Sequence, residues 1–237
     1  PTLNSVAITG AAGSQNNFVN ATDVVSVTAT FSEGAPSAVI VESGTAELTI
    51  VVGSDNRTAS YASGSGTTVS GSGNASLVFQ YTIQATGTSG ENDDDGISIP
   101  ANALNSGSIT IRDPAGNIAT DLTHSAVPDN SSFKVDTIRP SVDNFTMDDR
   151  EIIVNDNATV TLVFSEEVIL FNSDYDITHP NGELSTMTTN DNETWIGYFT
   201  PTLGIEDDTN TLSLANNSYT DLAGNNGPDN QTANYEV

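Results

Sequence analysis

The chain has 237 residues, and its 31 acidic and five basic residues give a formal net charge of −26 at neutral pH. Nucleic acids and anionic membranes attract basic surfaces, so five Lys and Arg residues argue against both as partners. There is no Cys, so no disulfide or thiol chemistry is expected, and no stretch reaches the length of about 18 apolar residues that membrane insertion requires.

In the first part of the chain, apolar and polar residues alternate in several short segments. The apolar side chains fall on every second position around residues 24–31, 77–83 and 109–111. Side chains two residues apart lie on one side of a β-strand, so each segment is predicted as a strand with one buried face. The residues expected on the buried faces are Val25, Val27, Ala29, Phe31, Leu77, Phe79, Tyr81, Ile83, Ile109 and Ile111.

Two segments of this first part have the composition of loops. Residues 63–76 read SGSGTTVSGSGNAS, and residues 85–96 read ATGTSGENDDDG. Gly, Ser, Asn and Asp favour turns and irregular backbone. We therefore predict that loop insertions lengthen the first part relative to the second.

The segment VDTIRP at residues 135–140 is predicted to join two domains. Pro140 fixes its own φ and biases Arg139 toward an extended conformation, so the junction is expected to be short and stiff. The predicted domains are residues 1–137 and residues 138–237.

The second part repeats the alternating pattern, and no part of the chain shows a helical stripe. The residues expected on buried faces here are Val160, Leu162, Phe164, Trp195, Gly197, Phe199, Leu212 and Leu214. About seven short strands per hundred residues, separated by turns, is the pattern of an immunoglobulin-like sandwich. The predicted fold class is all-β, with two tandem immunoglobulin-like β-sandwich domains.

Four landmarks occur in the same order in both parts of the chain. VVSVTATFSE at 24–33 resembles ATVTLVFSEE at 158–167, and DPAGN at 113–117 resembles DLAGN at 221–225. The two openings, PTLNSVAIT and PSVDNFTM, and the two closing segments, FKVD and NYEV, also match. We interpret the chain as a duplicated module. The N-terminal residues do not show the basic segment and apolar core of a signal peptide, and ANYEV ends inside a strand-like run, so we expect a piece of a longer chain.

The segments VDTIRPSVDNFTM, ATVTLVFSEEV, NGELSTMTTNDNETWIGYFTP and SYTDLAGN together resemble a bacterial Ig-like repeat. Such repeats occur in tandem in large secreted adhesins, including RTX-type adhesins. The resemblance covers residues 139–237, and the longer first part is similar to a related repeat type. It implies a β-sandwich module that extends a surface adhesin and is rigidified by calcium.

The acidic residues cluster in predicted loops, where carboxylates from distant segments can converge on Ca²⁺. The densest cluster is GENDDDG at 90–96, in which Glu91, Asp93 and Asp95 alternate. It starts like a calcium loop, but it lacks the later bidentate Glu and the flanking helices of an EF-hand. Carboxylates this close repel each other unless a cation lies between them. A solvated acidic loop is the alternative interpretation.

Further candidate ligands occur at strand ends and turns. Each of them taken singly also fits a solvated surface or a charge that protects an edge strand. The two Asp-x-Ala-Gly-Asn turns are foremost conformational turns, and their Asp and Asn side chains are candidate oxygen donors. These further candidates are Glu33, Asp113, Asn117, Asp148, Glu166, Asp174, Asp176, Asp207, Asp208, Asp221 and Asn225.

The resemblance assigns a role to Asp136, in the junction. In tandem adhesin repeats an acid in a Val-Asp-Thr junction can help bind an interdomain calcium, and loop acids such as Asp148 or Glu166 would complete the site. An ion bound there would freeze the hinge.

We expect no enzyme. The chain has no Cys nucleophile, no G-x-S-x-G elbow and no phosphate-binding loop, and nothing marks one acid of a pair as the raised-pKa acid of a glycosidase. His124 and His179 are isolated and are interpreted as surface residues.

The function we expect is a calcium-stabilised spacer of a long bacterial surface adhesin, extracellular and monomeric, that contacts neighbouring repeats and projects a distal binding domain. The alternative is a calcium-dependent carbohydrate- or peptide-binding module that recognises a cell-surface ligand through the longer first part.

Overall fold

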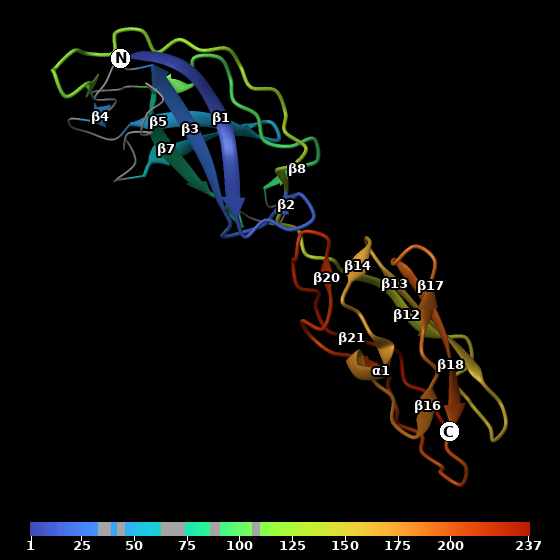
Figure 1. Ribbon diagram of the computed structural model, residues 1–237. Coiled ribbons are helices and arrows are strands. Elements are labelled where there is room, and N and C mark those ends of the chain that lie inside the picture. The colour runs from blue at the N-terminus through green and yellow to red at the C-terminus, as the bar shows by residue number, and fades with distance from the viewer. Residues whose placement is uncertain (33–38, 42–45, 63–73, 86–90, 106–109) are drawn as a thin grey trace. The chain divides into compact units, whose positions relative to one another are not determined.

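The computed structural model describes residues 1–237 except 33–38, 42–45, 63–73, 86–90 and 106–109 (Figure 1). The predicted all-β fold is confirmed, because the described residues form strands and one four-residue helix. The chain divides into two compact units, Pro1–Ile138 and Arg139–Val237. The sequence placed this boundary one residue earlier.

Unit 1 is built on a six-stranded sheet in the order β1-β3-β7-β6-β5-β9, with two small sheets, β10-β4 and β2-β11-β8. The strands of the large sheet are β1 (Thr2–Ala12), β3 (Val24–Ser32), β5 (Glu47–Val52), β6 (Asp55–Tyr61), β7 (Asn74–Thr82) and β9 (Leu104–Asn105). The other strands are β2 (Phe18–Val19), β4 (Ile40–Val41), β8 (Asn92–Asp93), β10 (Ile111–Arg112) and β11 (Lys134–Asp136).

The alternating pattern of β3 places one face in the core of unit 1. Val25, Val27, Ala29 and Phe31 are fully buried, and the Ser and Thr residues between them are half-exposed. In the antiparallel pairing with β7, Val27 lies opposite Phe79 and Ala29 opposite Leu77, so the two strands share one apolar face. Burying one such Val or Phe side chain contributes about 2 kcal/mol. Ile109, predicted on the same pattern, lies outside the described residues.

An ion pair between the partly exposed Arg57 and the buried Glu91 joins segments of unit 1. Glu91 is only 3 % exposed, and its carboxylate accepts hydrogen bonds from Nε of Arg57 in β6 and from the hydroxyl of Tyr81 in β7. The backbone N–H of Gln84 donates to the other carboxylate oxygen at 2.8 Å. Burial raises the pKa of Tyr81, which keeps the phenol protonated as a donor.

The backbone of Glu91 also forms hydrogen bonds with Thr137, near the end of unit 1. The N–H of Glu91 donates to Oγ1 of Thr137 at 2.8 Å, and the N–H of Thr137 donates to the carbonyl of Glu91 at 3.2 Å. Glu91 was predicted as a calcium ligand, but here the positive charge beside its carboxylate belongs to Arg57. Glu91 and Arg57 thus form a structural ion pair in this part of the fold.

Asp93, next to it in the acidic loop, is also turned inward. Its two carboxylate oxygens accept the N–H groups of Gly53 and Gly96, both at 2.7 Å. Burial raises the pKa of Asp93, and a hydrogen bond with Asp95 adds to the shift. Gly96 has φ +101°, and a Cβ there would lie 2.1 Å from the carbonyl oxygen of Asn130. Protein donors therefore fold this loop around Asp93, whereas Asp95 stays exposed.

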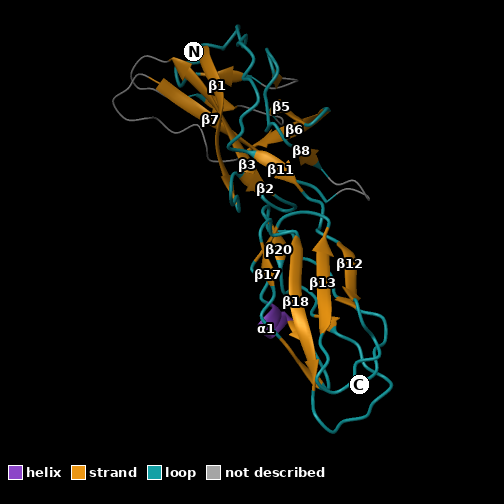
Figure 2. Cartoon of the chain, turned by 90° about the vertical axis from the view of Figure 1, so that its right-hand side faces the viewer, coloured by secondary structure: helices purple, strands orange, loops and turns teal. Residues whose placement is uncertain are grey.

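Unit 2 carries its main sheet in the order β12-β13-β18-β16, with β17 also paired to β18, and Figure 2 shows β12, β13 and β18 side by side. The strands of this sheet are β12 (Val142–Met147), β13 (Ala158–Phe164), β16 (Gly182–Leu184), β17 (Thr188–Thr189) and β18 (Thr194–Pro201). The smaller sheets β14-β20 and β15-β19-β21 contain β14 (Val168–Ile169), β15 (Ile177–Thr178), β19 (Ser213–Leu214), β20 (Thr220–Asp221) and β21 (Asn230–Gln231).

Aromatic side chains fill the core of unit 2. The ring of Phe164 lies 4.6 Å from that of Tyr219 and 5.5 Å from that of Phe171. Trp195, expected in the core, packs edge-on against Phe171 at 4.8 Å and is half-buried. Opposite Val160 in the sheet, Gly197 leaves room for the side chain of Met187, because a Cβ there would lie 2.8 Å from its Cγ.

The single turn of helix α1 (Ser173–Asp176) was not predicted, because four residues are too few to show a helical stripe. Asn172 caps it: its side chain accepts the N–H of Asp174 at 3.0 Å, and its own N–H donates to the carboxylate of Asp176 at 2.7 Å. Carboxylates in the first turn favour a helix because its N-terminus is positively polarised.

The ion pair in unit 1 predicts the effect of Arg57→Gln. The substitution leaves the buried carboxylate of Glu91 without its counter-charge, so we expect the free energy of unfolding of unit 1 to fall by about 3 kcal/mol. Chemical denaturation that resolves the two units measures this loss. Arg150→Gln in unit 2 removes the same charge from an exposed side chain and serves as the control. Equal, small effects of both substitutions would contradict the structural role of the pair.

Candidate metal centre

The two Asp-x-Ala-Gly-Asn segments form the same turn, one after β10 and one after β20. In the first turn the N–H of Asp113 donates to the carbonyl of Asn117, and the N–H of Gly116 donates to the carbonyl of Asp113, both at 3.0 Å. In the second turn the corresponding bonds of Asp221 measure 3.2 and 3.3 Å. The glycines have φ of +92° and +87°, a conformation that other residues resist.

The side chains of each turn also bond to each other. The carboxylate of Asp113 accepts the backbone N–H of Asn117 at 2.8 Å and its Nδ2 at 2.6 Å. The carboxylate of Asp221 accepts the same groups of Asn225 at 2.9 and 2.8 Å. The bond from Asn117 holds the pKa of Asp113 below its usual range. The amide nitrogens of the two Asn residues bond to the Asp, and these bonds do not test the prediction that their amide oxygens bind an ion.

The structure brings Glu166 and Asp221 together at one end of unit 2. Strand β14 pairs with β20 so that Val168 lies opposite Asp221, and Glu166 comes two residues before Val168. Carboxylate oxygens of Glu166 and Asp221 lie within 4.8 Å of one another. Asp221 is fully buried and Glu166 partly buried.

The electrostatics of this pair favour a cation. Two negative charges about 5 Å apart repel by about 3 kcal/mol at an effective dielectric constant of 20. Burial strengthens the effect, because a buried carboxylate needs a partner charge or several donors. Each oxygen of Asp221 accepts one N–H and keeps a second lone pair. The pair can therefore bind a hard cation without breaking the turn.

The other predicted ligands of unit 2 bond mainly to protein donors. The carboxylate of Asp148 accepts the N–H of Thr159 at 2.6 Å, and that of Asp174 accepts the hydroxyl of Thr186 at 3.1 Å. The carboxylate of Asp207 accepts the N–H of Thr209 and Nδ2 of Asn181, both at 2.9 Å. Hydrogen bonds from Thr159 and Thr209 hold the pKa values of Asp148 and Asp207 below their usual range. These acids stabilise turns.

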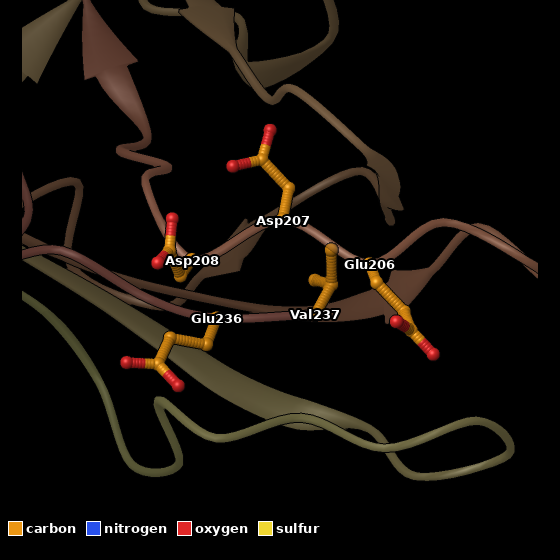
Figure 3. A pocket seen from close by; sticks show the side chains of 5 residues that line it. All are labelled: Glu206, Asp207, Asp208, Glu236 and Val237. Atoms are coloured by element: carbon orange, nitrogen blue, oxygen red, sulfur yellow. The ribbon is translucent and has the colours of Figure 1, made fainter.

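The acidic segment at 206–208 lines an open hollow with Glu236 and Val237 (Figure 3). The carboxylates of Glu206 and Glu236 point down to opposite sides, and those of Asp207 and Asp208 point up, so the four do not converge on one point. Asp207 and Asp208, which were predicted as candidate metal ligands, thus line an acidic hollow.

Two predicted ligands remain. Glu33, the counterpart of Glu166 in the first part, lies outside the described residues. Asp136 is in β11, and its carboxylate accepts the N–H of Ile138 at 2.9 Å.

The start of unit 2 is bound to the segment that carries Glu166, a feature the sequence did not reveal. The N–H of Ser141 donates to Oγ of Ser165, and the N–H of Ser165 donates to the carbonyl of Ser141, both at 2.9 Å. Nε of Arg139 donates to the carbonyl of Asn226, next to the second turn, at 2.5 Å. The repeated Phe-Ser-Glu motif drew attention to this segment, but it did not show that Ser141 is the partner of Ser165.

Comparisons with known proteins give one similarity, which covers the second part of the chain. No curated protein and no solved structure shows a match. No helix among the described residues is long and apolar enough to cross a membrane. Residues 136–237 match a family model described as bacterial Ig-like domain. This segment is therefore similar to bacterial Ig-like domains, which are modules typical of extracellular and surface-exposed proteins.

Proposed function

We propose that the chain is a calcium-stabilised extension module of a bacterial surface adhesin and that Glu166 and Asp221 form the centre of its ion site. The observation that carries this proposal is the close approach of these two carboxylates, one of them fully buried. The match to bacterial Ig-like domains supports a surface location.

The donor set favours calcium over other metals. The described part of the site offers carboxylate oxygens, which hard cations prefer, and the chain has no Cys. Calcium takes six to eight oxygen ligands in flexible geometries, and waters can fill positions that the protein leaves open. Magnesium needs a nearly ideal octahedron, which a site made from a turn and a strand end does not impose.

Asp136 is our proposed third acid, because the chain itself restricts where it can go. It precedes Ser141 by five residues, and Ser141 is bound to Ser165, the neighbour of Glu166. Five extended residues span at most about 17 Å. Arg139, three residues after Asp136, is bound beside the turn of Asp221. Asp136 is also the first residue that the family model matches.

Such an ion gives the module a mechanical role. A cation that binds the junction acid and two acids of unit 2 restricts rotation about the residues between them. The chain then behaves as a stiff spacer, which would project a distal binding domain from the cell surface. Binding to the folded form alone also stabilises the fold, by an amount that grows with the calcium concentration.

Calcium binding should raise the stability of unit 2. We expect a saturable heat signal in calorimetric titration, and a melting temperature several degrees higher in millimolar calcium than in chelator. Asp221→Asn and Glu166→Gln should each weaken calcium affinity at least tenfold. Glu183→Gln is the control, because Glu183 is exposed on β16. Unchanged melting in calcium and chelator would refute the site.

The junction makes a separate prediction. If Asp136 is a ligand, calcium should slow the tumbling of each unit toward that of a single larger body, as measured by NMR relaxation of backbone amides. Asp136→Asn should abolish this slowing and leave the fold of each unit intact. A slowing that is the same in wild type and Asp136→Asn would show that Asp136 is not the third ligand.

A further inference from the structure

An apolar hollow of about 390 Å³ lies at the end of unit 2 that carries the C-terminus. Both views place this end opposite β20, away from the proposed ion site (Figures 1 and 2). Apolar residues of the hollow are Ile152, Ile153, Val154, Pro201, Ile205 and Val237. We call it the hairpin-end hollow, because residues 152–154 lie in the segment that joins strand β12 to its partner β13.

Hydrogen bonds fix the walls of this hollow to one another. The N–H of Ile152 donates to the carbonyl of Glu236 at 2.9 Å, and Asp207 and Val237 exchange two N–H to carbonyl bonds at 3.0 Å. A turn in which the N–H of Asp156 donates to the carbonyl of Ile153 then carries the chain past the rim. The hollow is therefore built from a connected backbone.

Two apolar side chains of the hollow are exposed to solvent, although exposure of apolar area to water is energetically unfavourable. Ile153 is 71 % exposed and Val154 is 47 % exposed, next to the buried Ile152. Scattered exposed apolar residues are ordinary, but adjacent ones around a hollow mark an interaction surface. A partner that covers them removes this apolar area from water.

Charge identifies the kind of partner. The acidic hollow of Figure 3 adjoins the hairpin-end hollow and shares Glu206 and Val237 with it. Glu206, Asp208 and Glu236 are exposed there, and so is Arg150, whose carbonyl accepts the N–H of Glu236. Among the described residues around these hollows, acids thus outnumber bases next to an apolar surface. This combination complements a segment that carries apolar side chains next to Lys or Arg.

We propose that the hairpin-end hollow docks a basic, apolar segment of another protein. A second copy of this chain does not fit, because five basic residues and a net charge of −26 make two copies repel each other. An anionic membrane surface is repelled for the same reason.

The proposal is tested on the full chain in calcium with three synthetic hexapeptides. One alternates Lys and Leu, the second alternates Lys and Gly, and the third alternates Thr and Leu. We expect the Lys-Leu peptide to bind at least fivefold more tightly than either of the others. NMR shifts on binding should centre on residues 152–154 and 205–206. Equal affinity for the Lys-Leu and Lys-Gly peptides, or for the Lys-Leu and Thr-Leu peptides, would overturn the proposal.

Variants separate the hollow from general charge attraction. Ile153→Ser and Glu206→Gln should each weaken binding of the Lys-Leu peptide at least threefold, and because both side chains are exposed the fold should persist. Leu170→Ser, which removes a 75 % exposed apolar side chain elsewhere on unit 2, is the matched control. A loss of affinity in the control as large as in Ile153→Ser would overturn the assignment, as would binding to zwitterionic lipid vesicles that competes with the peptide.

Discussion

The buried carboxylate of Asp221 is the constraint on which the β14–β20 end of unit 2 depends. Its backbone begins the Asp-Leu-Ala-Gly-Asn turn, its side chain closes the turn through Asn225, and its strand holds β14. A buried charge is tolerated only where donors or an opposite charge surround it. Two amide donors satisfy the turn, and the carboxylate of Glu166 lies close by. The geometry of the turn and the proposed cation site therefore involve the same residue.

The two units balance their buried acids in different ways. In unit 1 the side chain of Arg57 lies against Glu91. In unit 2 the carboxylates of Glu166 and Asp221 lie close together, and Asp221 is fully buried. Because the chain has only five basic residues, it cannot repeat the solution of unit 1 often. Most other acids near the turns instead accept backbone N–H groups, as Asp148 does from Thr159. A chain this acidic thus uses its carboxylates mainly as turn-forming acceptors.

Much of the fold could be predicted because its signals are local. The period-two pattern placed Val25, Val27 and Phe31 on a buried face, and they are fully buried. The sequence pattern did not separate the acids from one another. Glu91, Asp148 and Glu166 all follow or precede strands in acidic segments, yet one faces Arg57, one caps a hairpin and one lies beside Asp221. Which partner an acid meets depends on strand pairing between distant segments, and a single sequence does not encode that in any local pattern.

The sequence by itself determined the all-β class, the repeated turn and the junction at Pro140, since alternation, glycine and proline act through the backbone of their own neighbourhood. Only the tertiary structure decided which carboxylates converge. The pairing of β14 with β20 brought Glu166 to Asp221, and the bond between Ser141 and Ser165 brought the start of unit 2 to the same place. The tertiary structure also brought Ile153 and Val237, which are 84 positions apart in the sequence, to one hollow. Convergence of this kind follows from long-range hydrogen-bond register, because a shift of one residue in a strand moves every side chain to the other face.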